Sequence, residues 1–196
     1  MNIYIDNHKF HYEIENLCRL FFPNSKFKII KDEKPQQEEE FIYTNIYLED
    51  NNAVINAKVR LFERVEEKYT QVSVNDSDFE NECERQLAII LFEILTDITG
   101  IKPPWGILTG IRPVKLMRKL VKEKGLNETI EYFKRVFKVS EEKTNLCFET
   151  MLNEQKIIAL SNAKSFSLYI SIPFCPSRCT YCSFVSQSIE KAARLI

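Results

Sequence analysis

Three cysteines near the C-terminal end of the sequence have the spacing of a metal-binding loop. Cys175, Cys179 and Cys182 follow the pattern C-x3-C-x2-C. Thiolates are soft ligands, and three of them on one short loop can surround a single iron-sulfur cluster. A four-iron cluster that is held by three thiolates keeps one iron open, and an open coordination position is where a metal centre does chemistry. The spacing therefore predicts a catalytic iron-sulfur site.

Other possible roles of the cysteines have less support in the sequence. A structural zinc site usually needs four nitrogen or sulfur ligands, and the two histidines, His8 and His11, lie far from the cysteine loop. A disulfide framework is not expected, because the polar N-terminus is unlike a signal peptide. The other cysteines, Cys18, Cys83 and Cys147, fall singly in helical patterns, and we interpret them as small buried hydrophobic residues. Zinc and idle thiols remain the alternatives to a cluster.

The cysteine pattern resembles the signature of the radical S-adenosylmethionine superfamily, in which an aromatic residue, here Tyr181, precedes the last cysteine. This resemblance implies a [4Fe-4S] cluster on Cys175, Cys179 and Cys182, with S-adenosylmethionine (SAM) bound at the open iron. In that superfamily the reduced cluster splits SAM and yields a 5'-deoxyadenosyl radical.

The flanking residues narrow the resemblance. The string Y-I-S-I-P-F-C-P-S-R-C-T-Y-C-S-F, from Tyr169 to Phe184, is similar to that of the oxygen-independent coproporphyrinogen III oxidase group. By this resemblance Tyr169 and Tyr181 bind SAM. Ser171 stands where the family pattern often has His, and Phe184 stands where the best-established oxidases have an additional Cys. A haem-chaperone subgroup and the HemZ-type coproporphyrinogen dehydrogenases share the second difference.

A second informative string is W-G-I-L-T-G-I-R-P, within residues 102–113, which hold two of the four glycines and the only tryptophan. Such a density of glycine and proline indicates an irregular backbone path. The string resembles a linker of HemZ-type proteins. We interpret it as a turn that anchors Trp105 at a domain junction. The alternative is that Arg112 and nearby backbone N–H groups bind an anion.

The resemblance implies an enzyme that converts coproporphyrinogen III propionates to vinyl groups by oxidative decarboxylation, giving protoporphyrinogen IX in haem biosynthesis. The alternatives are a haem chaperone without oxidase activity, a radical SAM enzyme that acts on RNA or another substrate, and a non-catalytic module. The expected partners are a porphyrinogen, an electron donor and an electron acceptor; the latter two and the catalytic residues are not identified.

Composition and charge limit the other function classes. The chain has 196 residues, 44% of them hydrophobic and 28% charged, which is typical of a globular protein with a core. The net charge of -1 favours neither a nucleic acid nor an anionic membrane as partner. Residues 112–138 hold nine Lys or Arg and three Glu, which we interpret as a solvated helix face. Attraction of porphyrinogen propionates is the alternative. No transmembrane run is present, and we expect a cytoplasmic protein with reduced thiols.

Residues 1–100 are expected to form an α+β domain. Apolar periodicity predicts helices over 13–22 and 79–98, the second ending at Gly100. Strands are predicted over the ranges 2–5, 27–30, 41–48, 53–62 and 69–74. We expect a small antiparallel sheet with one solvated face, in which Val59, Leu61 and Val65 point the same way.

The rest of the chain is expected to position the cysteine loop. Residues 101–165 are predicted to be a helical connector, with helices over 114–124, 126–137 and 141–160. Residues 166–196 are predicted to begin a radical SAM (β/α) barrel, with a buried strand over 167–172. A full barrel needs on the order of two hundred residues. The chain ends at Ile196, so we expect the first βα unit of an incomplete barrel, and no activity from these 196 residues alone.

Overall fold

The structure of the chain is a computed structural model. It describes residues 1–36, 39–110, 112–177, 179, 182, 184 and 186–192. The chain divides into two units, Met1–Gln155 and Lys156–Ile196, and the division falls near the end of helix α5 (Glu141–Ala159).

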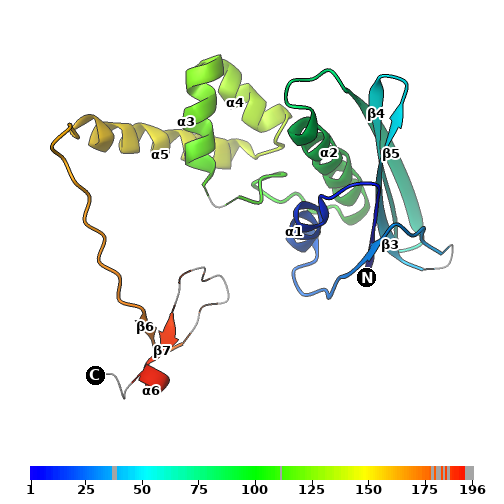
Figure 1. Cartoon of the computed structure of the whole chain (residues 1–196), viewed down its shortest axis with the longest axis horizontal. Coiled ribbons are helices and arrows are strands. Elements are labelled where there is room, and N and C mark those ends of the chain that lie inside the picture. The colour runs from blue at the N-terminus through cyan, green and yellow to red at the C-terminus, as the bar shows by residue number, and fades with distance from the viewer. Residues whose placement is uncertain are drawn as a thin grey trace. The chain divides into compact units, whose positions relative to one another are not determined.

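Five strands among the described residues of the first unit form one mixed sheet, in the order β2-β1-β3-β4-β5 (Figure 1). The strands are β1 (Asn2–Asp6), β2 (Lys28–Lys31), β3 (Phe41–Glu49), β4 (Asn52–Leu61) and β5 (Arg64–Ser73). β1 is parallel to both β2 and β3, whereas β3, β4 and β5 are antiparallel. Helix α1 (His11–Phe21) connects β1 to β2, and such a crossover returns the chain in the same direction. The α+β class is confirmed, and the expected antiparallel strands are present as β3, β4 and β5, but the sheet as a whole is mixed because β1 and β2 join it in parallel.

The hairpin between β4 and β5 decides which residues share a face of the sheet. Its two turn residues, Phe62 and Glu63, have positive φ angles of 52° and 65°, as in a type I′ turn. Leu61 pairs with Arg64, so Arg60 pairs with Val65. Directly paired residues lie on the same face, which puts Val65 opposite to Leu61. The expected common face of Leu61 and Val65 is therefore wrong, and Val65 is 50% exposed.

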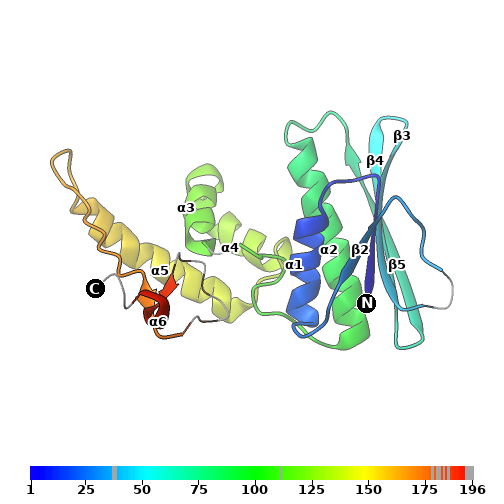
Figure 2. The same ribbon diagram turned by 60° about the horizontal axis from the view of Figure 1, so that its bottom comes forward.

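Two helices, α1 and α2 (Phe79–Thr99), cover one face of the sheet (Figure 2). Alternate strand residues and the apolar stripes of these helices meet in one core. Its fully buried members include Ile3, Ile5, Leu17, Ile42, Ile55, Leu87, Leu91 and Leu95. α2 ends at Gly100, whose φ of 71° is the left-handed conformation of a helix cap, as predicted. The opposite face of the sheet is left without a covering helix.

Helices α3 (Pro113–Lys124), α4 (Leu126–Arg135) and α5 lie close to their predicted positions and have a second core around Met117, Phe133 and Met151. Ile107 contacts both cores. Two polar contacts also join α2 to this region: Lys138 pairs with Glu93 at 2.8 Å, and Arg85 donates to the Tyr132 hydroxyl at 2.6 Å. None of the helices in the described ranges has the length and apolar character needed to cross a membrane.

The described residues of the second unit contain little regular structure. They form β6 (Phe174–Cys175), β7 (Gln187–Ser188) and α6 (Ile189–Ala192). The predicted buried strand over 167–172 is wrong for this chain, because these residues are irregular and Ile172 is 78% exposed. A strand needs neighbours to satisfy its backbone, and no described strand pairs with these residues. The described residues therefore show no barrel.

Candidate metal centre

The cysteine loop is closed at its base by two short strands. β6 and β7 pair in parallel, with Phe174 opposite Gln187 and Cys175 opposite Ser188. The Gln187 N–H also donates to the Pro173 carbonyl at 2.7 Å. Pro176 follows Cys175 directly, and a proline has no N–H with which to continue a ladder. The chain therefore leaves β6 at Cys175, and β7 begins beside β6 at Gln187.

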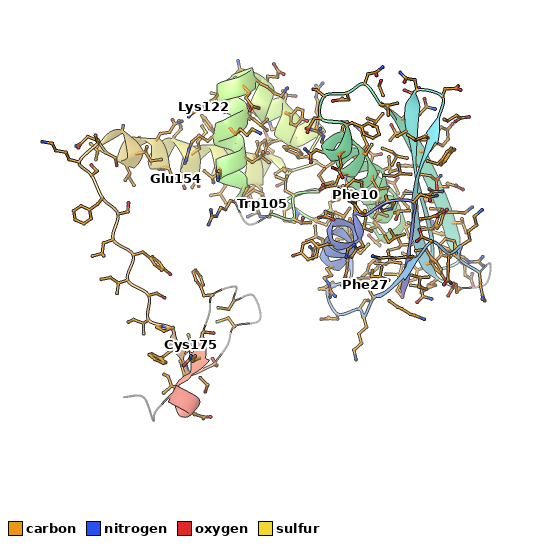
Figure 3. All side chains as sticks on the ribbon, in the orientation of Figure 1. Phe10, Phe27, Trp105, Lys122, Glu154 and Cys175 are labelled. Carbon is orange, nitrogen blue, oxygen red and sulfur yellow. The ribbon has the colours of Figure 1, made fainter. Side chains whose placement is uncertain are left out.

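The three predicted ligands lie along this loop. Cys175 and Cys182 are half-buried, and Cys179 is exposed. The Cys182 N–H donates to the Cys179 carbonyl at 3.1 Å, which keeps these two residues close together. The Cys182 Sγ lies 3.9 Å from the carbonyl oxygen of Phe184. Beside Cys175, which is labelled in Figure 3, a hollow of about 180 Å³ is lined by Ser177, Ser186, Gln187 and Ser188 among others.

The three cysteines are the right chemical type of ligand for an iron-sulfur cluster, but in this structure they are not arranged around a common point. Three thiols that are at least partly open to solvent on one loop are the soft ligands that such clusters use. Among the described residues, which include these cysteines, no three Cys, His, Asp or Glu side chains are arranged to hold a metal ion. A cluster would have to draw the sulfurs together as it binds, which is the coupling of metal binding to folding seen in small metal sites.

The other three cysteines are buried, as predicted. Burial raises the pKa of the Cys18 thiol in α1 far above its usual range, raises the pKa of Cys83 in α2, and raises the pKa of Cys147 in α5 to about 11. A thiol with such a raised pKa is protonated at neutral pH and is a poor metal ligand. The six cysteines therefore divide into three packing residues and three candidate ligands.

The predicted SAM contacts stay predictions. Tyr169 lies in the irregular segment before β6 and is 75% exposed. Tyr181 lies outside the described residues. Phe184, the residue that stands in place of a family cysteine, is exposed on the loop.

The described residues 105–110 of the W-G-I-L-T-G-I-R-P string form a turn between the two cores of the first unit. Gly106 has a φ of 57°, and a Cβ at this position would collide with the Phe137 carbonyl oxygen. The Ile107 N–H donates to the same oxygen at 2.9 Å. Trp105 packs against the connector core (Figure 3). These contacts support the turn interpretation. Arg112 is exposed, and its expected alternative role in anion binding stays a prediction.

The basic excess of residues 112–138 is largely met by carboxylates. Six of the nine cations pair with acids of the same helix or of another helix, as expected for a solvated helix face. The pairs are Arg118 with Glu154, Lys119 with Glu123, Lys124 with Glu128, Lys134 with Glu141, Arg135 with Glu131, and Lys138 with Glu93.

The sequence analysis missed a hollow on the uncovered face of the sheet. Its volume is about 450 Å³, and its lining includes Phe41 and Tyr43 of β3 and Lys58 and Arg60 of β4. The alternation of aromatic and basic residues in the two strands was visible. Only the register, which pairs Phe41 with Arg60 and Tyr43 with Lys58, shows that they share one face.

No protein-family model matches the chain. The chain is distantly homologous to the oxygen-independent coproporphyrinogen-III oxidase-like protein HemZ of Bacillus subtilis, with 24% identity over 199 residues. The match covers 96% of this chain and 38% of HemZ, so the chain spans well under half the length of that relative.

Among solved structures, protein VC0702 of Vibrio cholerae matches 79% of this chain and 97% of its own chain, with 12% identity and a TM-score of 0.27. At that score nothing about this chain follows from the match.

Proposed function

From this distant homology and the three-cysteine loop, we propose that the chain supplies the N-terminal domain and the cluster-binding loop of a radical SAM enzyme. The proposed reaction is the oxygen-independent conversion of coproporphyrinogen III to protoporphyrinogen IX. The loop is the observation that carries the proposal, because buried thiols elsewhere in the chain are unsuited to hold a metal.

The roles of the residues follow from their chemistry. Cys175, Cys179 and Cys182 would hold three irons of a [4Fe-4S] cluster, and Tyr169 and Tyr181 would line the SAM pocket. When bound, the cluster would supply the electron that cleaves SAM and so starts hydrogen-atom abstraction from the substrate. Phe174 and Phe184 flank the cysteines in the sequence and would keep water from the site.

The reaction also fixes which partners the enzyme needs. Each propionate side chain loses one hydrogen atom, one molecule of CO2 and one further electron to become a vinyl group. Two propionates react for each porphyrinogen. An electron donor must therefore reduce the site, and a separate acceptor must take the electron left after CO2 departs.

The first test is anaerobic reconstitution of the chain with iron and sulfide, followed by reduction and EPR with and without SAM. We expect a four-iron signal that changes on addition of SAM. The signal should disappear in Cys179→Ala and persist in the matched variant Cys147→Ala, whose cysteine is buried in the connector. Loss of the signal in both variants, or in neither, would contradict the assigned ligands.

The second test is turnover of coproporphyrinogen III by the reconstituted protein with SAM and a reductant. Formation of protoporphyrinogen IX and CO2 is the expected result when the barrel is complete. Tight haem binding without turnover would instead support a chaperone, the role that the Phe184 substitution keeps open. Products formed in RNA would assign a different substrate.

A further inference from the structure

The uncovered face of the sheet carries a hollow that does not belong to the cysteine loop. It has a volume of about 450 Å³ and lies entirely on the first unit, over β3, β4 and β5 and beside residues 34–36. This volume falls within the range of small-molecule pockets, about 300 to 1,000 Å³. The three strands are joined by hairpins, so the hollow is built on paired backbone.

The floor of the hollow is aromatic, and hydrogen bonds hold its tyrosine in place. Phe41 is only 5% exposed, and the ring of Tyr43 is its next neighbour along the same face. The Tyr43 hydroxyl donates to Asp6 at 2.7 Å and accepts from the Asn45 side chain at 3.1 Å. Burial and the nearby Asp6 raise the pKa of Tyr43 to about 12, so the hydroxyl stays protonated and keeps donating at neutral pH. A ring held in this way is a preformed surface on which another ring can stack.

The rim of the hollow is cationic. Lys34, Lys58 and Arg60 line it, and one carboxylate, Glu67, opposes them. Lys58 pairs with Glu67 at 3.0 Å, and this bond lowers the pKa of the Glu67 carboxyl. The lining thus holds three cationic side chains and one carboxylate, and Lys58 and Arg60 both already have interaction partners. An anion that enters would compete with Glu67 for Lys58.

The loop that supplies Lys34 is tied to the same face. Glu39, near the end of this loop, accepts hydrogen bonds from the Tyr4 hydroxyl and from the Asn2 side chain, the latter at 2.7 Å. Its carboxylate also accepts from the Gln36 N–H at 3.3 Å. Residues 34–36 are thereby kept beside the sheet, which gives the hollow a third wall.

We propose that this hollow binds a small planar anion, with its ring on the half-buried Tyr43 and its carboxylate or phosphate at Lys58 and Arg60. A nucleic-acid strand fits less well, because the carboxylates of Asp6 and Glu39 lie on the same face outside the hollow and would repel further phosphates. The site is separate from the cysteine loop, so failure of either proposal leaves the other standing.

The test is an NMR titration of the whole chain, isotope-labelled on nitrogen, with two charged probes. AMP presents a ring with a phosphate, and indole-3-acetate presents a ring with a carboxylate. We expect at least one of them to shift the amide signals of β3 and β4, and the stronger of the two identifies the anionic group. Adenosine has the ring but no phosphate, and inorganic phosphate has no ring. Each should bind at least about tenfold more weakly.

Two variants of the rim give opposite expectations. Lys58→Met removes a cation and should weaken binding about tenfold. Glu67→Gln removes the competitor of the anion and should strengthen binding severalfold. Lys68→Met is the matched control, because Lys68 lies on the other face of β5 and pairs with Glu93 and Asp97.

The outcomes separate cleanly. No shift by either charged probe up to about 10 mM would overturn the proposal. Equal weakening by Lys58→Met and Lys68→Met would also overturn it, because that result indicates a nonspecific charge effect. Tighter binding of a single-stranded oligonucleotide than of AMP would assign the face to nucleic acid instead.

Discussion

The two units of the chain differ in how far their apolar side chains are buried. Leu91 and Phe133 of the first unit are fully buried, whereas Phe166 and Ile170 of the second are 89% and 77% exposed. The first unit therefore stabilises itself by burial, and its fold does not depend on the candidate metal ligands. The residues that carry the proposed chemistry lie in the unit that leaves its apolar residues in water.

The largest expected difference between the units is in thiol reactivity. Under native conditions, Cys175, Cys179 and Cys182 should react readily with a thiol reagent such as iodoacetamide. Cys18, Cys83 and Cys147 should react more slowly by a factor of at least about a thousand, because their modification requires the core to open. Mass spectrometry of peptides after timed labelling measures each rate. Fast labelling of Cys18 would show that the first unit is not closed in solution.

Truncation of apolar side chains should affect only the first unit. Leu91→Ala removes a fully buried side chain of α2 and should lower the free energy of unfolding by about 2 to 5 kcal/mol. Leu168→Ala, the same change at a 76% exposed position, should change it by less than about 0.5 kcal/mol. Urea unfolding followed by the fluorescence of Trp105 reports on the first unit. A large effect of Leu168→Ala would mean that the exposed segment packs in solution.

The turn at Gly106 sharpens the comparison within the first unit. Gly106→Ala places a Cβ against the Phe137 carbonyl at a positive φ and should cost about 2 to 4 kcal/mol. Gly110→Ala is the matched control, because a Cβ there meets nothing within 4 Å. Its cost should stay below about 1 kcal/mol. Equal costs would mean that the turn is not rigid, and the same urea experiment measures both.

The smallest predicted effect is the pH dependence of stability that His8 contributes. Its ring is half-buried, stacks on Phe10 and lies 3.0 Å from the Thr44 hydroxyl. Burial lowers the pKa of His8 from 6.5 to about 4, although Asp6 and Asp32 act in the opposite direction.

The direction of this pH effect follows from proton uptake. Between pH 6.5 and about 4, His8 is protonated in the unfolded chain but stays neutral in the folded protein, so the unfolded state binds more protons. The contribution of His8 to the free energy of unfolding is complete above pH 6.5. About 1 to 3 kcal/mol of it is lost as the pH falls to about 4. The difference in free energy of unfolding between wild type and His8→Gln, measured as a function of pH, separates the effect of His8 from that of the carboxylates. A ring that titrates near pH 6.5 in an NMR experiment would contradict the prediction.

Local patterns predicted the helices of the first unit well. The ends of α2, α3 and α5 depend on neighbours in the sequence: Gly100 caps α2, Pro113 begins α3, and the Ser140 hydroxyl accepts from the Lys143 N–H at 3.2 Å before α5. Such signals need no knowledge of the rest of the fold. The burial of Cys18, Cys83 and Cys147 followed from the same periodicity.

Features that depend on distant partners were harder to predict. The parallel pairing of β1 with β2 follows from the α1 crossover, which the sequence analysis did not use, and its pairing with β3 brings together residues far apart in the sequence. The face of Val65 depends on the length of one turn, because a shift of one residue reverses every side chain. The strand expected before Cys175 depends on neighbours that the described residues do not contain. The cysteine pattern itself is local, and for that reason it was visible from the sequence.

The order of the strands also has a consequence for solubility. Within the described residues, β2 and β5 are the outer strands of the sheet, and such strands offer unpaired backbone groups to other molecules. β2 is short and has a lysine at each end, Lys28 and Lys31. β5 is longer, but it carries charged side chains on both faces, such as Glu67 and Lys68. Both borders thus discourage strand-by-strand aggregation between copies of the protein, which leaves the uncovered face of the sheet available to a ligand.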